Sequence, residues 1–255
     1  MSNPVTSAPV TAALVIIGNE ILSGRTRDAN LPYIASKLNE IGIRLAEVRV
    51  VGDFEDQIVA AVNACRSSHA YVFTTGGIGP THDDITAHAI AKAFGLPIER
   101  NQDAVALLSR YYDPRDLNEA RLSMAEMPVG ASLIENPVST APGFQIGNVF
   151  VLAGVPSIMQ AMFDGIKTRL KGGAPMLSRT IGCFLPEGAI ADGLTALQDR
   201  HAKVEIGSYP FFRLGKFGTS LVLRSEDAAL LAAAAGELRA MLEKFGAEPI
   251  EDPAG

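Results

Sequence analysis

Residues 74–84 read TTGGIGPTHDD, a stretch in which three glycines are followed by two adjacent acidic residues. An apolar run, AYVF at 70–73, comes directly before it, and a helix-like segment at 85–94 follows. The glycines therefore stand where a buried strand passes into a helix. Glycine lets the backbone turn tightly and approach a ligand closely, and the free N–H groups at a helix start attract anions. This stretch predicts a loop that binds a phosphorylated ligand.

The polar members of this loop have two interpretations. The candidate phosphate-binding residues are Gly76, Gly77, Gly79 and Thr81. The candidate metal ligands and catalytic acids are Asp83 and Asp84, which would hold a divalent cation against phosphate oxygens. In the alternative, Thr81, Asp83 or Asp84 only caps the helix and the glycines only make a turn. No Gly-Lys-Ser/Thr follows the glycines, so the loop is not a Walker motif.

The composition bounds the class of protein. The chain has 255 residues, of which 47% are hydrophobic and 20% charged, and its formal net charge is −6. These values are typical of a soluble globular protein, and the acidic balance argues against a general nucleic-acid binder. Cys65 and Cys183 stand far apart with no Cys-x-x-Cys pair, which disfavours a zinc site.

We expect a cytoplasmic protein that does not enter a membrane. No apolar run approaches the roughly 20 residues that span a bilayer. Residues 1–11 are polar, contain proline and lack a basic stretch before an apolar one, so they predict a disordered leader and not a signal peptide.

Strand-like and helix-like segments alternate along the first two thirds of the chain. Strands are expected at 12–17, 45–51, 71–74 and 149–153, with helices between them, after the last of them, and, as a pair, across 101–135. This alternation predicts a three-layer α/β fold, a mostly parallel sheet with helices on both faces. Residues 171–175, KGGAP, read as a linker. The predicted domains are therefore 12–170 and a small α+β domain at 176–250.

Three strand ends carry polar or glycine-rich residues, at 18–20, 75–77 and 154–156. Ligands of open α/β sheets bind beyond the carboxyl ends of the strands, so all three should open onto one crevice. Glu20 is there a candidate metal ligand or acid/base, or simply an acceptor for amides of the next turn. Gly154 and Ser157 could offer amides to a phosphate or ribose. Asp53 is interpreted as a helix cap, because Asp56 follows as in a capping box.

A further polar loop lies between two prolines, at residues 137 and 142. It contains Ser139 and Thr140, and Gly143 follows it. Proline excludes regular helix and central strand here, so the loop suits ligand contact, or is a plain surface turn.

Five segments, in this order, resemble the MoaB/Mog-like molybdopterin-binding domain, and specifically the amino-terminal domain of CinA-type (competence/damage-inducible) proteins. They read GNEILSG at 18–24, VGD at 51–53, GGIGPTHDDIT at 76–86, NPVSTAPGF at 136–144 and GVPS at 154–157. The resemblance covers about residues 12–170, and the tail looks like the same family's small domain. Too few residues follow Leu170 to house the carboxy-terminal amidase domain of many CinA proteins, so that activity is not expected.

The resemblance implies a fold that binds a small phosphorylated nucleotide or pterin. CinA-type relatives are associated with metal-dependent cleavage of ADP-ribose and similar pyrophosphates, which implies Mg²⁺, Mn²⁺ or Co²⁺ at Asp83 and Asp84, with Glu20 nearby. Two alternatives stay open: a module that binds molybdopterin or a nucleotide without turnover, and adenylyl transfer to molybdopterin. Relatives tend to form homo-oligomers, which we also expect here.

Overall fold

The computed structural model describes residues 9–213 and 215–251, and the chain divides into two compact units between Gly173 and Ala174. Each unit has its own sheet and its own hydrophobic core. The predicted leader, at residues 1–11, lies outside the described residues as far as residue 8. Val10 and Thr11 pair with the neighbouring strand, so the first strand begins before the predicted Ala12.

A six-stranded sheet forms the centre of the first unit, in the order β2-β1-β3-β8-β7-β6. Its parallel strands are β1 (Val10–Ile17), β2 (Ile43–Val51), β3 (Tyr71–Thr75) and β8 (Val149–Leu152). Two short strands, β7 (Gly143–Ile146) and β6 (Ser132–Ile134), continue the sheet in antiparallel pairing. The sheet is mostly parallel, as predicted.

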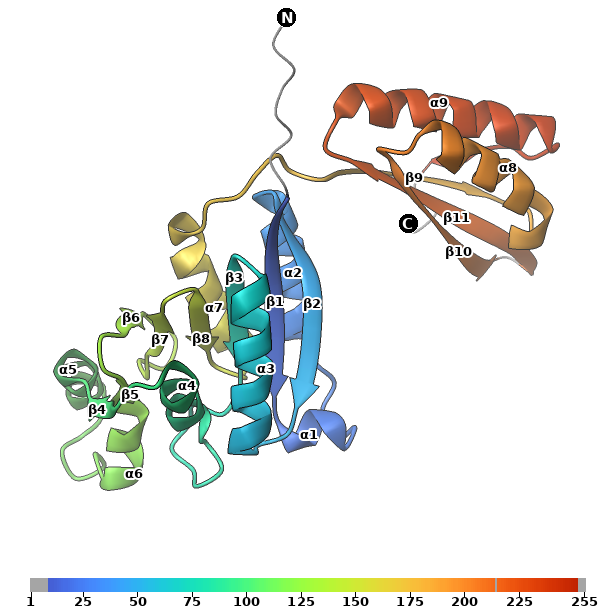
Figure 1. Cartoon of the computed structure of the whole chain (residues 1–255). Helices are drawn as coiled ribbons and strands as arrows, with labels where there is room; N and C mark the ends of the chain where they lie inside the picture. The colour runs from blue at the N-terminus through green and yellow to red at the C-terminus, as the bar shows by residue number, and fades with distance from the viewer. Residues whose placement is uncertain (1–8, 214, 252–255) are drawn as a thin grey trace, which may run out of the picture. The chain divides into compact units, whose positions relative to one another are not determined.

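Helices cover both faces of this sheet (Figure 1). One face carries α2 (Asn30–Glu40) and α7 (Pro156–Ile166), and the other carries α3 (Glu55–Ser68) and α4 (Thr86–Phe94). Helices are needed on both faces because the side chains of β1 alternate between the two cores, and those at 12–17 are at most 3% exposed. A strand that is apolar on both faces must be buried on both. The predicted three-layer fold is confirmed.

The prediction of two helices across residues 101–135 is partly wrong. Only α5 (Gln102–Tyr111) and the single turn α6 (Glu119–Leu122) are α-helical there. β5 (Glu126–Pro128) then pairs with β4 (Ile98–Arg100), and β6 pairs with β7. Strands of three residues are too short to show a side-chain period, so their pairing partners and not their own sequence give them their structure.

The second unit is a four-stranded antiparallel sheet, in the order β10-β11-β9-β12, with two helices packed on it. Its elements are β9 (Leu177–Cys183), α8 (Glu187–Arg200), β10 (Glu205–Arg213), β11 (Lys216–Ser225), α9 (Ala228–Lys244) and β12 (Ile250–Glu251). The predicted small α+β architecture is confirmed, with β12 as an additional strand.

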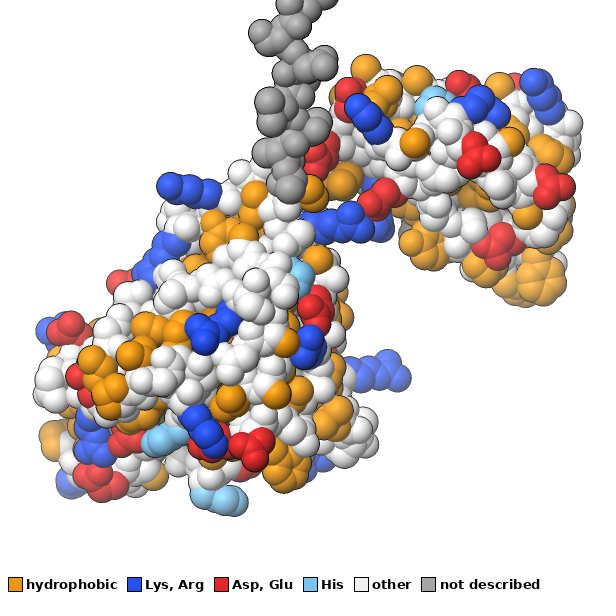
Figure 2. All heavy atoms as spheres, viewed as in Figure 1, with side chains coloured by type: hydrophobic (Ala, Val, Ile, Leu, Met, Phe, Trp, Pro, Cys, Tyr) orange, Lys and Arg blue, Asp and Glu red, His pale blue; other side chains and the backbone are white. Residues whose placement is uncertain are grey.

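Hydrophobic side chains gather on the surface at the adjoining ends of β10 and β11 (Figure 2). Phe212 and Phe217 are 63% and 70% exposed there, with ring centroids 4.8 Å apart. The expected homo-oligomer stays a prediction. Within residues 9–213 and 215–251, no helix has the length and apolar character needed to cross a membrane.

Candidate functional site

A cavity of about 410 Å³ opens at the carboxyl ends of the parallel strands in the first unit. Residues that follow β1, β3 and β8 meet there, because parallel strands end at the same edge of a sheet. Of the predicted site residues, eight line this main cavity: Glu20, Gly76, Gly77, Gly79, Asp83, Asp84, Ser139 and Gly154. The structure thus brings most of the candidate set together.

Four predicted site residues lie outside the lining of the main cavity. Thr81 contacts Asp84 from the loop, and Ser157 is exposed in the first turn of α7. Thr140 adopts a positive φ of 67°. Gly143 lies in β7, where an added Cβ would be 2.2 Å from the Val151 carbonyl oxygen. Its small size therefore serves strand packing.

The glycine loop needs glycine at its first two positions. Gly76 has a φ of 103°, and a Cβ on it would be 2.2 Å from the carbonyl oxygen of Ile17. Gly77 has a φ of 67°, and its Cβ would meet the Thr86 hydroxyl at the same distance. That hydroxyl donates to the Gly76 carbonyl at 3.0 Å, and the Thr86 N–H donates to Gly77. The loop is therefore fixed to the start of α4.

Three backbone N–H groups of the loop are free to bind a ligand. No acceptor within the described residues takes a hydrogen bond from the N–H of Gly77, Ile78 or Gly79. All three residues line the main cavity. Consecutive free N–H groups in a glycine-rich turn are a common phosphate-binding device.

Asp84 is held in place by Thr81. Its Oδ2 accepts a hydrogen bond from the Thr81 N–H at 2.9 Å and another from the Thr81 hydroxyl at 2.5 Å. The capping interpretation of these residues is wrong, because the N-cap of α4 is Ile85 and receives no side-chain capping bond. Thr81 and Asp84 bond to each other within the loop, before the helix begins, so neither side chain caps α4.

Thr81 also affects the exposed Asp83. Hydrogen bonding from Thr81, and then from the backbone of Asp83 itself, lowers the pKa of the Asp83 carboxyl below its usual value. A hydroxyl has only one proton to donate, so the two carboxylates compete for it. In this structure the Thr81 hydroxyl donates its hydrogen bond to Asp84.

Glu20 lines the same cavity as the glycine loop, from the short helix α1 (Asn19–Leu22) that follows β1. Its carboxylate makes no hydrogen bond or ion pair with any described residue, so the alternative of an acceptor for nearby amides is not observed. Instead it lies over Gly18, where a Cβ would be 2.5 Å from Oε1. The carboxylate therefore remains available to a ligand.

Asp53 is a member of the main cavity that sequence reasoning treated only as a helix cap. The N-cap of α3 is Phe54, without a side-chain bond, so that interpretation is wrong. The Asp53 Oδ2 accepts from the N–H of Asn19 at 2.8 Å instead. A capping pattern was present in the sequence, but the amide that Asp53 serves belongs to α1, 34 residues earlier.

The loop between the prolines is shaped by Asn136, another residue that sequence reasoning did not single out. Its Oδ1 accepts from the N–H groups of Val138 and Ser139, each at 3.0 Å, while its Nδ2 donates to Ala141. An asparagine directly before a proline is a known turn signal and could have identified it. It places Ser139 at the main cavity.

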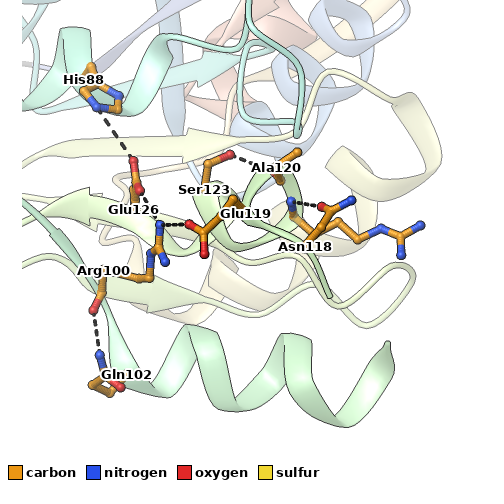
Figure 3. A network of polar contacts seen from close by, with 9 residues as sticks. His88, Arg100, Gln102, Asn118, Glu119, Ala120, Ser123 and Glu126 are labelled. Atoms are coloured by element: carbon orange, nitrogen blue, oxygen red, sulfur yellow. Dashed lines mark hydrogen bonds and ion pairs between the residues drawn. The ribbon is translucent and has the colours of Figure 1, made fainter. Parts of the chain in front are cut away.

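Apolar residues complete the wall, and two of them, Tyr112 and Met124, come from the segment whose structure was mispredicted. A polar network holds this segment to α4 and β4 (Figure 3). Arg100 contacts Glu119 at 3.0 Å and Glu126 at 3.1 Å, and Glu126 lies 3.8 Å from the ring of His88. No local signal in the sequence predicts that these residues meet.

Comparison with known proteins identifies the first unit. The sequence model of a protein family described as "probable molybdopterin binding domain" matches residues 13–172. The chain belongs to this molybdopterin-binding family. A protein of Pyrobaculum calidifontis is 36% identical over 211 residues, which cover 78% of this chain and 80% of that protein. The crystal structure of CinA from Thermoplasma acidophilum, a protein described as having unknown function, is 36% identical to this chain and superposes with a TM-score of 0.60. The match covers 63% of this chain and 98% of that one.

The second unit has a different likeness. Residues 175–250 match the family described as "FAD synthase, middle domain". A protein named "probable FAD synthase" from Caenorhabditis elegans is 31% identical over 261 residues, covering 91% of this chain. The chain spans half of that relative's length. Both domains of the chain therefore have counterparts in one relative named for nucleotide chemistry.

The molybdopterin-binding domain offers oxygen donors that fit a divalent cation arriving with a ligand. Among the described residues, the main cavity is lined by four carboxylates, those of Glu20, Asp53, Asp83 and Asp84, and by no lysine, arginine or histidine. The described residues contain no cluster of three metal-ligating side chains. Mg²⁺ is commonly bound by one or two carboxylates together with substrate phosphates, so a preformed cage is not needed.

Proposed function

We propose that the first unit is a metal-dependent nucleotide pyrophosphatase of the ADP-ribose type. The observation that carries the proposal is the pairing, in one cavity, of three free loop N–H groups with several carboxylates. The N–H groups suit phosphate oxygens, whereas carboxylates alone would repel them. Both can act on one ligand if the ligand is a phosphoanhydride accompanied by a divalent cation.

The loop N–H groups and the carboxylates have different roles in this proposal. The N–H groups of Gly77, Ile78 and Gly79 bind one phosphate and stabilise the charge that develops on it during the reaction. Asp83 and Asp84 hold Mg²⁺, Mn²⁺ or Co²⁺, with the Asp84 Oδ2 already oriented by Thr81. When bound, the cation neutralises phosphate charge and lowers the pKa of a water molecule.

Glu20 is the candidate general base. Its carboxylate, which has no partner among the described residues, lines the same cavity as the loop and could accept the proton of the attacking water. Water adds its oxygen to one phosphorus, and the bond from that phosphorus to the bridging oxygen breaks. For ADP-ribose the products are AMP and ribose 5-phosphate, and two protons are released to solvent when both monophosphates are dianions.

Product analysis tests this proposal. The protein is incubated with ADP-ribose, FAD, NAD or ATP in the presence of Mg²⁺, Mn²⁺ or Co²⁺, and the nucleotide products are separated by chromatography. We expect AMP from at least one dinucleotide, and no product when EDTA removes the metal. Release of pyrophosphate only from ATP plus molybdopterin would support adenylyl transfer instead.

A second candidate is a module that binds a nucleotide or pterin without turnover. The absence of a three-residue metal cluster among the described residues favours it, because many hydrolases hold their metal before the substrate arrives. Saturable binding of ADP-ribose in Mg²⁺ without any cleaved product would support this candidate over the pyrophosphatase.

A further inference from the structure

A smaller cavity lies beside the main one and shares part of its wall. It has a volume of about 60 Å³, and Glu20 and Gly154 line both cavities. Its other polar lining includes Arg27, Asp28, Asn30 and Thr75. We call it the side cavity. A ligand with its phosphates on the glycine loop would therefore have this space within reach of its neighbouring atoms.

Two buried side chains of the side cavity have an oxygen without a partner. Asn30 is 3% exposed and Thr75 is 1% exposed, and within the described residues neither the Asn30 Oδ1 nor the Thr75 Oγ1 makes a hydrogen bond. The Asn30 Nδ2 donates to the Gly154 carbonyl at 2.9 Å, which identifies Oδ1 as the unused acceptor. Buried polar atoms are nearly always paired, so these two indicate a missing partner.

The chemistry of the lining selects a neutral hydrogen-bond donor. Asn30 Oδ1 and the Glu20 carboxylate only accept hydrogen bonds, and the Thr75 hydroxyl can accept as well. Asp28 uses one carboxylate oxygen on the N–H of Leu31. The guanidinium of Arg27 offsets one of the two carboxylates in the lining, which makes a cation a poorer fit than hydroxyl groups.

We propose that the side cavity binds the vicinal hydroxyls of a ribose ring whose phosphate lies on the glycine loop. The proposal rests on the proposed function, since it assumes a nucleotide in the main cavity. A water molecule needs roughly 10–15 Å³ of such space, so the side cavity has room for two hydroxyls but not for a base or a pterin ring. A carboxylate that binds ribose hydroxyls is a general device of nucleotide sites.

The consequence is selectivity for ribonucleotides over deoxyribonucleotides. A site whose buried acceptors expect a hydroxyl discriminates strongly against an analogue that lacks it, because those acceptors then stay unpaired. We expect ADP to bind at least tenfold more tightly than 2′-deoxy-ADP in excess Mg²⁺.

The test compares the dissociation constants of ADP and 2′-deoxy-ADP by titration calorimetry in the full chain. Thr75→Val keeps the shape of the side chain and removes its hydroxyl, and it should reduce the preference for ADP at least fivefold. Thr75→Ser keeps the hydroxyl and should preserve it. Thr74→Val is the matched control, because Thr74 is equally buried, its hydroxyl also has no partner among the described residues, and it lines neither cavity.

The outcomes separate this inference from the proposed function. Equal affinity of the wild type for both nucleotides overturns the ribose subsite and leaves a nucleotide site in the main cavity. A preference for ADP that survives Thr75→Val, or that Thr74→Val reduces just as much, also overturns it. If neither nucleotide binds, the nucleotide-binding function fails and this inference fails with it.

Discussion

The carboxylate of Asp53 accepts a hydrogen bond from the backbone N–H of Asn19 at 2.8 Å, across 34 residues of chain. Asp53 follows the end of β2, and Asn19 is the first residue of α1. The N–H groups at a helix start have no partner within the helix, so this bond fixes α1 against the neighbouring strand. Since α1 carries Glu20, one long-range contact positions an acid of the main cavity.

Two substitutions of Asp53 distinguish the effect of this hydrogen bond from the effect of the carboxylate charge. Asp53→Ala removes the acceptor and should lower the free energy of unfolding by about 1 kcal/mol, whereas Asp53→Asn keeps an acceptor and should stay within about 0.5 kcal/mol of wild type. Both remove a negative charge from the main cavity and should reduce metal-dependent cleavage. Urea denaturation and rate assays measure the two effects, and equal destabilisation by both substitutions would refute the role of the hydrogen bond.

The hydroxyl of Thr81 should matter because it orients Asp84. Thr81→Val keeps the shape and the backbone N–H but loses the hydroxyl bond, and we expect kcat to fall roughly tenfold. Thr81→Ser retains the hydroxyl and should restore most of the rate. The paired rate measurements would contradict the assignment if serine proved as slow as valine.

Gly143 should tolerate no side chain. A Cβ there would lie 2.2 Å from the Val151 oxygen and 2.5 Å from the Met162 side chain, so Gly143→Ala should destabilise the protein by about 1–3 kcal/mol. The control is Gly165→Ala, at an exposed position of helix α7, where a Cβ meets nothing within 4 Å. That change should be neutral or stabilise by up to about 1 kcal/mol. Thermal unfolding compares them, and similar melting temperatures would refute the packing argument.

The raised pKa of Tyr33 predicts that the free energy of unfolding falls at alkaline pH. Burial, with a hydrogen bond to Asp164 at 2.8 Å, raises the pKa of Tyr33 to about 12 from 10.0. Between these values the unfolded chain loses this proton more readily than the folded one, so the contribution is complete below pH 10 and disappears as the pH rises towards 12. Denaturation of Tyr33→Phe from pH 9 to 12 should show a shallower decline than wild type or Tyr111→Phe, a control at an exposed tyrosine. Identical slopes would exclude this role.

Much of the fold could be predicted because its signals are local. The run at 12–17 is apolar at every position, which predicts a strand buried on both faces, and the glycines at 76 and 77 adopt the positive φ that a tight strand-to-helix turn requires. Strand ends of a parallel sheet share one edge, so the meeting of Glu20, the glycine loop and Gly154 followed from topology alone.

The remaining features depend on contacts between distant segments. Asp53 has the spacing of a helix cap, yet its partner is Asn19 on another element. Tyr112 and Met124 reach the main cavity only because β5 pairs with β4, and three-residue strands carry too little pattern to predict that pairing. The side-chain amide of Asn30 donates to the carbonyl of Gly154, 124 residues later in the chain, so its place beside the main cavity also depends on a distant contact.

The most direct test of the proposed catalysis is the effect of Asp84→Asn on turnover and affinity, measured separately for whichever dinucleotide the wild type cleaves. Asparagine preserves the size of the side chain and an acceptor for Thr81 but removes the charge that holds the cation. We predict that kcat falls by about 10²–10³ while the dissociation constant of the substrate changes only a few-fold, because the loop N–H groups still bind its phosphate. Equal losses in kcat and in affinity, or an unchanged kcat, would contradict a catalytic role for this acid.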